Sequence, residues 1–110
     1  MTLELGMVLV IVKLGPGERG IKQRVKEIVP LIMQVLQIHA KNDGQLAFTD
    51  SDGSTFGYLL ETSKSLKAIR NDVSMVSGFS GSDSCLVVEL TGDVEGIGFS
   101  RAWNWMSHRQ

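Results

Sequence analysis

The pattern of hydrophobic and polar positions predicts four strands and two helices. Longer segments with apolar residues at steps of three and four predict helices at 21–39 and 65–77. Short aliphatic runs without helical spacing predict strands at 7–14, 45–49, 55–62 and 84–90. This order is that of the ferredoxin-like fold, in which two helices cover one face of a four-stranded antiparallel sheet. We therefore expect one α+β domain over 1–110, with a C-terminal extension that forms a short helix at 99–110, capped by Ser100.

Local signals mark where the elements begin and end. Gly15-Pro16-Gly17 ends the first strand, and Asp52-Gly53 predicts a tight hairpin between the second and third strands. Ser63 or Ser65 is expected to cap the second helix. Pro30 lies inside the first helix, where a missing amide donor predicts a kink or a break.

The strands are apolar on both faces, although one face of such a sheet usually meets water. In the first strand, alternate residues point in opposite directions and all are apolar: Val8, Val10 and Val12 against Met7, Leu9 and Ile11. An uncovered second face would exceed the apolar patch that a monomer normally exposes. We expect the C-terminal residues and a second copy of the chain to cover it together, with Trp103, Trp105 and Met106 at the contact. The chain is then a homodimer.

Composition and charge exclude several classes of protein. The chain has 110 residues, of which 43% are hydrophobic and 21% charged, with a formal net charge of −1. Such a balance argues against disorder and against a general attraction to nucleic acid or anionic lipid. Cys85 is the single cysteine, so no internal disulfide forms, and a buried, inert thiol is expected. The apolar run at 7–12 is too short to span a bilayer, and we expect a cytoplasmic protein without membrane contact.

A glycine-rich segment follows the first strand and precedes the first helix. Gly15, Gly17 and Gly20 match the pattern G-x-G-x-x-G, which in dinucleotide sites brings a pyrophosphate to a helix N-terminus. The segment is therefore a candidate ligand site, with Arg19 and Lys22 assisting the free amides. A simple anion suits it better than a nucleotide, because an antiparallel hairpin follows instead of a parallel unit. The favoured interpretation is a glycine-rich start of the helix.

A nucleic-acid interface is a further possibility. Arg19, Lys22, Arg24 and Lys26 give the start of the first helix a basic face. Phe56 and Tyr58 alternate on the third strand, which resembles the aromatic signature of RNA-recognition motifs. However, no basic residue precedes the first aromatic ring, and the matching position of the first strand is aliphatic. We therefore favour rings that pack under the C-terminal residues or a second copy.

No catalytic or metal-binding constellation is predicted, and no cofactor is expected. Asp50, Asp52 and Glu61 imitate the spacing of a calcium loop, but threonine occupies the position that needs glycine. The two histidines and Cys85 lack ligand spacing. Turn formation accounts for the loop aspartates.

Four segments resemble small uncharacterised bacterial proteins described as SinR-like: 58–62, 66–72, 83–90 and 98–105. These proteins are distantly similar to CRISPR-associated endoribonuclease-like and VapD-type proteins. The resemblance implies a ferredoxin-like fold and a homodimer. Nuclease members carry an aspartate at the end of the first strand, one from each subunit, to hold a metal. Here that strand ends Val12-Lys13-Leu14, so the resemblance does not imply nuclease activity.

These observations favour a non-enzymatic homodimer that binds or regulates a partner. Two alternatives remain open at this point. One is a nucleic-acid-binding protein, or an inactive relative of the small nucleases. The other is a small-ligand or nucleotide binder at Gly15–Gly20.

Overall fold

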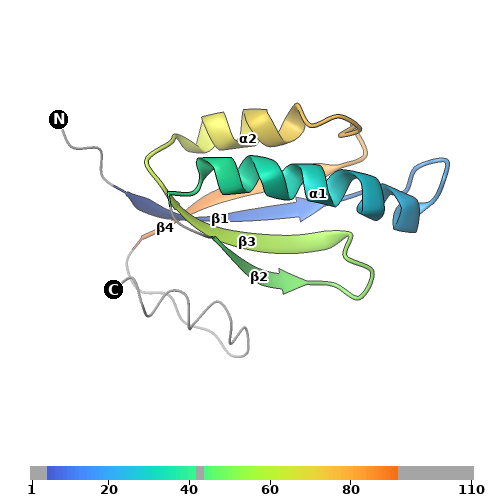
Figure 1. Cartoon of the computed structure of the whole chain (residues 1–110), viewed down its shortest axis with the longest axis horizontal. Helices are drawn as coiled ribbons and strands as arrows, with labels where there is room; N and C mark the ends of the chain where they lie inside the picture. Colours follow the sequence, from blue (N-terminus) through green and yellow to red (C-terminus); the bar gives the residue numbers. More distant parts are fainter. Residues whose placement is uncertain (1–4, 42–43, 92–110) are drawn as a thin grey trace.

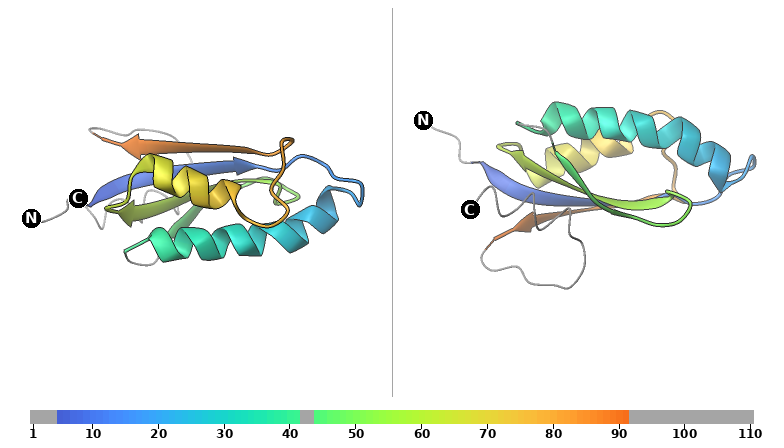
Figure 2. Two further views of the ribbon diagram at one scale, coloured as in Figure 1. Left: turned by 90° about the horizontal axis from the view of Figure 1, so that it is seen from above. Right: turned by 60° about the horizontal axis from the view of Figure 1, so that its bottom comes forward.

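The computed structural model of the chain describes residues 5–41 and 44–91. They form an α+β structure with one four-stranded antiparallel sheet and two helices on the same face of it (Figure 1). Figure 2 shows this layering from two further directions. The elements in chain order are β1 (Gly6–Lys13), α1 (Ile21–His39), β2 (Gln45–Thr49), β3 (Thr55–Thr62), α2 (Leu66–Ser74) and β4 (Ser84–Leu90).

The strand order is β2-β3-β1-β4, so β1 and β3 lie in the centre and the other two strands form the edges. Every neighbouring pair is antiparallel. The arrangement is compatible with a ferredoxin-like fold. The predicted strands at 45–49, 55–62 and 84–90 are confirmed, and β1 begins and ends one residue earlier than predicted.

Of the predicted kink or break at Pro30, the break is absent, because α1 runs without interruption from Ile21 to His39. Pro30 lies on the exposed side of the helix, and so does Lys26, whose carbonyl loses its helical donor. Water can reach that carbonyl, so no buried acceptor is left unpaired. The opposite side of α1 carries the buried residues Ile28, Ile32 and Leu36.

The hydrophobic core lies between the two helices and the sheet. Val8, Val10 and Val12 of β1 enter it from below, and Ile69 and Val73 of α2 enter it from above. Phe56, Tyr58 and Leu60 belong to the same cluster and lie beside the valines in the strand register. The helix-facing side of the sheet is therefore fully apolar at its centre.

The second helix is shorter than predicted. The Ser65 hydroxyl accepts a hydrogen bond from the amide of Ala68 at 3.1 Å, which confirms the predicted cap. The helix ends at Ser74 instead of continuing to residue 77. Beyond it the chain turns, and the amide of Val76 donates to the carbonyl of Val73 at 3.2 Å.

The hairpin between β2 and β3 accounts for the loop aspartates. Asp50 accepts bonds from the amide of Thr55 and the hydroxyl of Ser54, and Asp52 accepts from the amide of Ser54. The bond from Thr55 is the main reason why the pKa of Asp50 is lowered. Gly53 takes the positive φ of 78° that the turn requires. The aspartates therefore build the turn.

The opposite side of the sheet, which we call the open face, is also apolar. Leu59 is only 2% exposed there, and Met7, Leu9, Ala47 and Leu90 pack against it. The prediction of two apolar faces is confirmed. The C-terminal helix and the contacts predicted for Trp103, Trp105 and Met106 lie outside the described residues.

Candidate functional site

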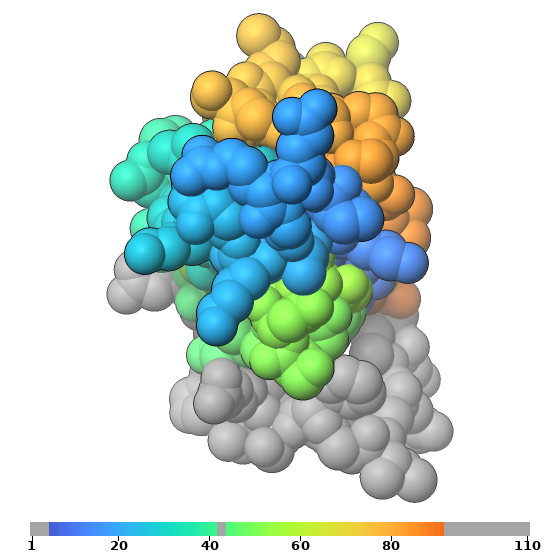
Figure 3. Space-filling model, turned by 90° about the vertical axis from the view of Figure 1, so that its right-hand side faces the viewer, coloured from blue at the N-terminus to red at the C-terminus, as the bar shows by residue number. Residues whose placement is uncertain are grey.

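Three loops meet at one end of the molecule. They are the β1–α1 loop (14–20), the hairpin at 50–54 and the α2–β4 loop (75–83), which Figure 3 shows in blue, green and orange. The amide of Leu14 donates to the carbonyl of Ser54 at 2.8 Å, which ties the first loop to the hairpin. This end carries the residues predicted to bind a small ligand. Its geometry therefore decides whether the glycine-rich segment is a ligand site or only the start of a helix.

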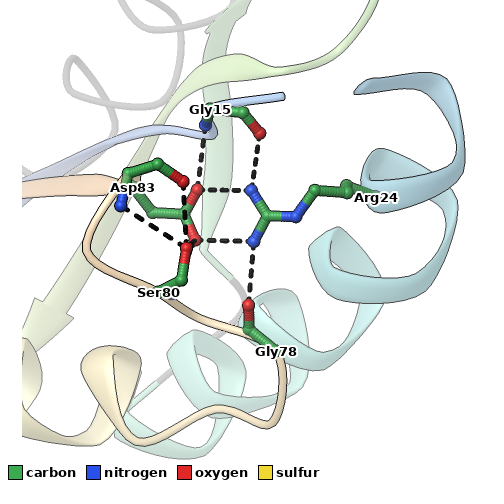
Figure 4. A network of polar contacts seen from close by, with 6 residues as sticks. Gly15, Arg24, Gly78, Ser80 and Asp83 are labelled. Carbon is green, nitrogen blue, oxygen red and sulfur yellow. Dashed lines mark hydrogen bonds and ion pairs between the residues drawn. The ribbon is translucent and has the colours of Figure 1, made fainter. Parts of the chain in front are cut away.

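A bidentate ion pair between Arg24 and Asp83 joins α1 to the α2–β4 loop (Figure 4). The two guanidinium nitrogens donate to the two carboxylate oxygens at 2.6 and 2.7 Å. The same nitrogens also donate to the carbonyls of Gly15 and Gly78. The Arg24 side chain is 12% exposed and the Asp83 side chain 0%. A parallel, two-bond pair of this kind fixes both groups in one orientation.

Backbone donors complete the coordination of the buried carboxylate. The amides of Gly15 and Ser80 each donate to Asp83 at 2.8 Å. The bonds from Arg24 hold the pKa of Asp83 far below its ordinary value, although burial alone would raise it. The pair therefore fastens together three segments that are distant in the sequence: the β1–α1 loop, α1 and the α2–β4 loop.

This network changes the interpretation of the glycine-rich segment. Both the amide and the carbonyl of Gly15 are already bonded within the network. A side chain at Gly15 would meet the carbonyl oxygen of Ser82 at 2.6 Å, and one at Gly17 would meet Cδ of Arg24 at 2.6 Å. Gly20 has a φ of 87°. Close packing and backbone conformation account for all three glycines without a phosphate.

A cleft of about 440 Å³ opens beside the network, between the start of α1 and the α2–β4 loop. Arg19 and Gln23 line it, but both interact with Glu27, at 3.2 and 2.6 Å. An anion would have to displace the Glu27 carboxylate and approach Glu18, which also lines the cleft. Lys22 is not among the lining residues. The cleft therefore does not bring together Arg19 and Lys22, the two basic residues that the sequence analysis proposed for binding an anion.

The predicted nucleic-acid residues are not brought together either. Phe56 and Tyr58 are 2% and 3% exposed and lie on the helix-covered side of the sheet. They are unavailable for stacking, and they also do not pack on the open face, as the favoured alternative required. Arg24 is committed to Asp83. Lys22 and Lys26 remain exposed on α1.

No known family model, curated protein or solved structure matches this chain. The resemblance to SinR-like proteins therefore stays a prediction. One of its details can be compared with the structure. The end of β1 does lie near a carboxylate, but Asp83 supplies it from the α2–β4 loop and Arg24 neutralises it.

Two further polar side chains, His39 and Cys85, are partly buried. His39 Nε2 lies 2.7 Å from Oδ2 of Asp72 and so connects the end of α1 to α2. Burial raises the pKa of the Cys85 thiol, and the charge of Arg70 lowers it by a smaller amount.

Within 5–41 and 44–91, no three acidic, histidine or cysteine side chains gather as a metal site. No helix in that part of the chain has the length and hydropathy to cross a bilayer.

The outer margin of the sheet is the remaining candidate surface. Leu86 of β4 points to the open face, because it is paired with Ile11 in the register, and it is 58% exposed. Met7, Leu9 and Ile11 are only partly exposed. Apolar exposure on the open face is therefore concentrated at its edge strand, β4.

Asp83 was not identified from the sequence as the centre of the polar network. It lies 59 positions from Arg24 and stands in a serine- and glycine-rich loop, where a surface aspartate is the ordinary expectation. A usable signal was present in the loop itself. An aspartate three residues after a serine often accepts a bond from that serine's amide, as it does here at 2.8 Å.

Proposed function

We propose that the protein is a non-enzymatic, homodimeric binding protein, and that two copies associate on the β4 side of the sheet. The observation that carries this proposal is the exposure of Leu86, at 58%, at the margin of an otherwise packed apolar face. Leu86 adjoins the partly exposed Met7, Leu9 and Ile11 on the same face, and a contiguous apolar surface of this kind is typical of protein contact sites.

Burial of Leu86 in the dimer contributes enough free energy to change the dissociation constant measurably. Full burial of a leucine side chain contributes about 1.5–3 kcal/mol, so burying the exposed part of Leu86 contributes roughly 1–2 kcal/mol per copy. A two-fold dimer uses the residue twice. The pair then contributes about 2–4 kcal/mol, which corresponds to a change of roughly 30- to 1,000-fold in the dissociation constant.

A binding role fits the polar groups better than a catalytic one. Arg24 and Asp83, the two charged groups with the least solvent access in their network, are bonded to each other and to the backbone. Arg19 is paired with Glu27. A catalytic residue needs a polar atom that is free to meet substrate. The polar atoms of these side chains are instead bonded to other groups of the protein.

Light scattering coupled to size-exclusion chromatography tests the proposal with a matched pair of variants. Leu86→Lys places a charge on the β4 margin, and the dissociation constant should rise by at least about 30-fold. Ile38→Lys makes the same kind of change on α1, where the side chain is 82% exposed, and should leave the dimer intact. Equal behaviour of the two variants would contradict the placement of the contact.

A further inference from the structure

The two edges of the sheet differ in a way that points to one of them as a pairing strand. β2 has five residues, and its register with β3 shifts between Leu46 and Phe48. Short length and a bulge are common means by which edge strands avoid pairing with another chain. β4 has seven residues and an unbroken register with β1. Within the described residues, β4 has a partner strand on one side only.

We propose that the β4 strands of two copies pair antiparallel about a two-fold axis at Val87, which joins the two sheets into one. This inference rests on the proposed homodimer and names the contact through which it forms. The occupant of the β4 edge is therefore a second copy of this chain.

The alternation of side chains limits the possible registers. Antiparallel neighbours point to the same face, so a symmetric pair of β4 strands must be centred on a residue and not between two residues. Centring on Val87 pairs all seven residues of Ser84–Leu90. It places Leu86 opposite Val88 of the partner subunit on the open face, twice by symmetry. The exposed Leu86 side chain then acquires an apolar neighbour.

Charge complementarity favours the same register. Glu89 is exposed and lies on the helix-facing side of β4, since it is paired with Val8. In the register centred on Val87, it lies opposite Cys85 of the partner subunit. Arg70 is an exposed residue of α2, and its charge acts on Cys85 within one chain. Within its own chain the Glu89 carboxylate lies over Gly6 of β1, and rotation of this exposed side chain turns it toward Arg70 of the partner subunit.

The neighbouring registers lack this match. Centring on Leu86 places Glu89 opposite Asp83 of the partner subunit, a buried carboxylate that lies outside β4 and offers Glu89 no opposite charge. Centring on Val88 places Glu89 opposite Val87, which offers no charge. Both shifts also leave part of β4 without a strand partner.

A charge exchange tests the contact in the full chain by sedimentation equilibrium. Glu89→Arg and Arg70→Glu each place like charges together, and each should weaken dimerisation by about tenfold or more. The combination Arg70→Glu with Glu89→Arg restores opposite charges and should return the dissociation constant to within about threefold of wild type. Glu18→Arg, on the exposed β1–α1 loop, makes the same change in charge away from β4 and should have little effect.

Cross-linking gives an independent readout of the register. In a Cys85→Ser background, Val87→Cys places two thiols directly opposite each other, at a Cα separation of about 4.5–5.5 Å that a disulfide can span. Leu86→Cys in the same background places its own pair diagonally, at about 7–8 Å, beyond comfortable reach. Mild oxidation should therefore cross-link the Val87→Cys protein much faster.

The outcomes separate this inference from the proposed function. A wild-type chain that stays monomeric overturns both. A wild-type dimer that is insensitive to both charge reversals, or that cross-links equally at positions 86 and 87, overturns the β4 pairing and leaves the homodimer standing. The pairing is supported if each single charge reversal weakens dimerisation and the combined variant recovers it.

Discussion

Removing the Asp83 carboxylate should destabilise the protein more than any other single change to a surface loop. Asp83→Ala leaves the guanidinium of Arg24, which is 12% exposed, without its counter-charge. It also leaves the amides of Gly15 and Ser80 without their acceptor.

The structure sets the size of the effect. Breaking a buried pair by removal of one partner costs about 3–5 kcal/mol. A domain of this length is stable by about 5–15 kcal/mol in total, so the loss is a large fraction of its stability. With a urea dependence of about 1.5 kcal/mol per molar, the unfolding midpoint should fall by about 2–3 M.

Urea unfolding followed by tryptophan fluorescence and circular dichroism measures this change. Arg19→Met serves as the control, because it removes an exposed ion pair with Glu27 and should cost less than about 1 kcal/mol. Asp83→Asn provides a milder variant that keeps the side-chain shape if the alanine variant does not fold. A loss for Asp83→Ala no larger than that for Arg19→Met would refute the central role of the network.

Three further predictions follow from the same structure. The pKa of Asp83 is lowered in the folded protein, so its contribution is complete above about pH 5, begins to decrease near the ordinary aspartate pKa of about 4, and is lost as the pH falls toward the much lower pKa of the folded state. Acid unfolding curves should therefore be steeper for wild type than for Asp83→Asn; parallel curves would contradict this. Ser65→Ala should lower stability by about 1 kcal/mol in urea, and an unchanged midpoint would exclude a working cap. The Cys85 thiol, whose pKa burial raises, should react with iodoacetamide at least about tenfold more slowly in folded than in unfolded protein by mass spectrometry; equal rates would show an accessible thiolate.

The sequence predicted the secondary structure well where local chemistry decides it. The Asp-Gly turn located the hairpin, and the side chain of Ser65 located the start of α2. The break that Pro30 suggested is absent because the cost of a proline depends on whether the freed carbonyl is buried. That property depends on which side of α1 meets the core, and in the structure the proline lies on the solvent side.

The sequence could not assign the faces of the sheet or the polar network. Strands that are apolar on both sides give no alternation to show which side meets the helices, so Phe56 and Tyr58 were predicted on the open face, whereas they lie in the helix-covered core. The partnership of Arg24 with Asp83 depends on tertiary packing across 59 positions. The glycine pattern at 15–20 was recognised, but its cause is the close approach of Ser82 and Arg24.

The most direct measurement of the central claim is the molar mass of the full chain by sedimentation equilibrium over a range of micromolar concentrations. Association through the β4 side predicts a mass that rises to twice the chain mass of 12.0 kDa. A mass that stays at 12.0 kDa at every concentration would contradict it.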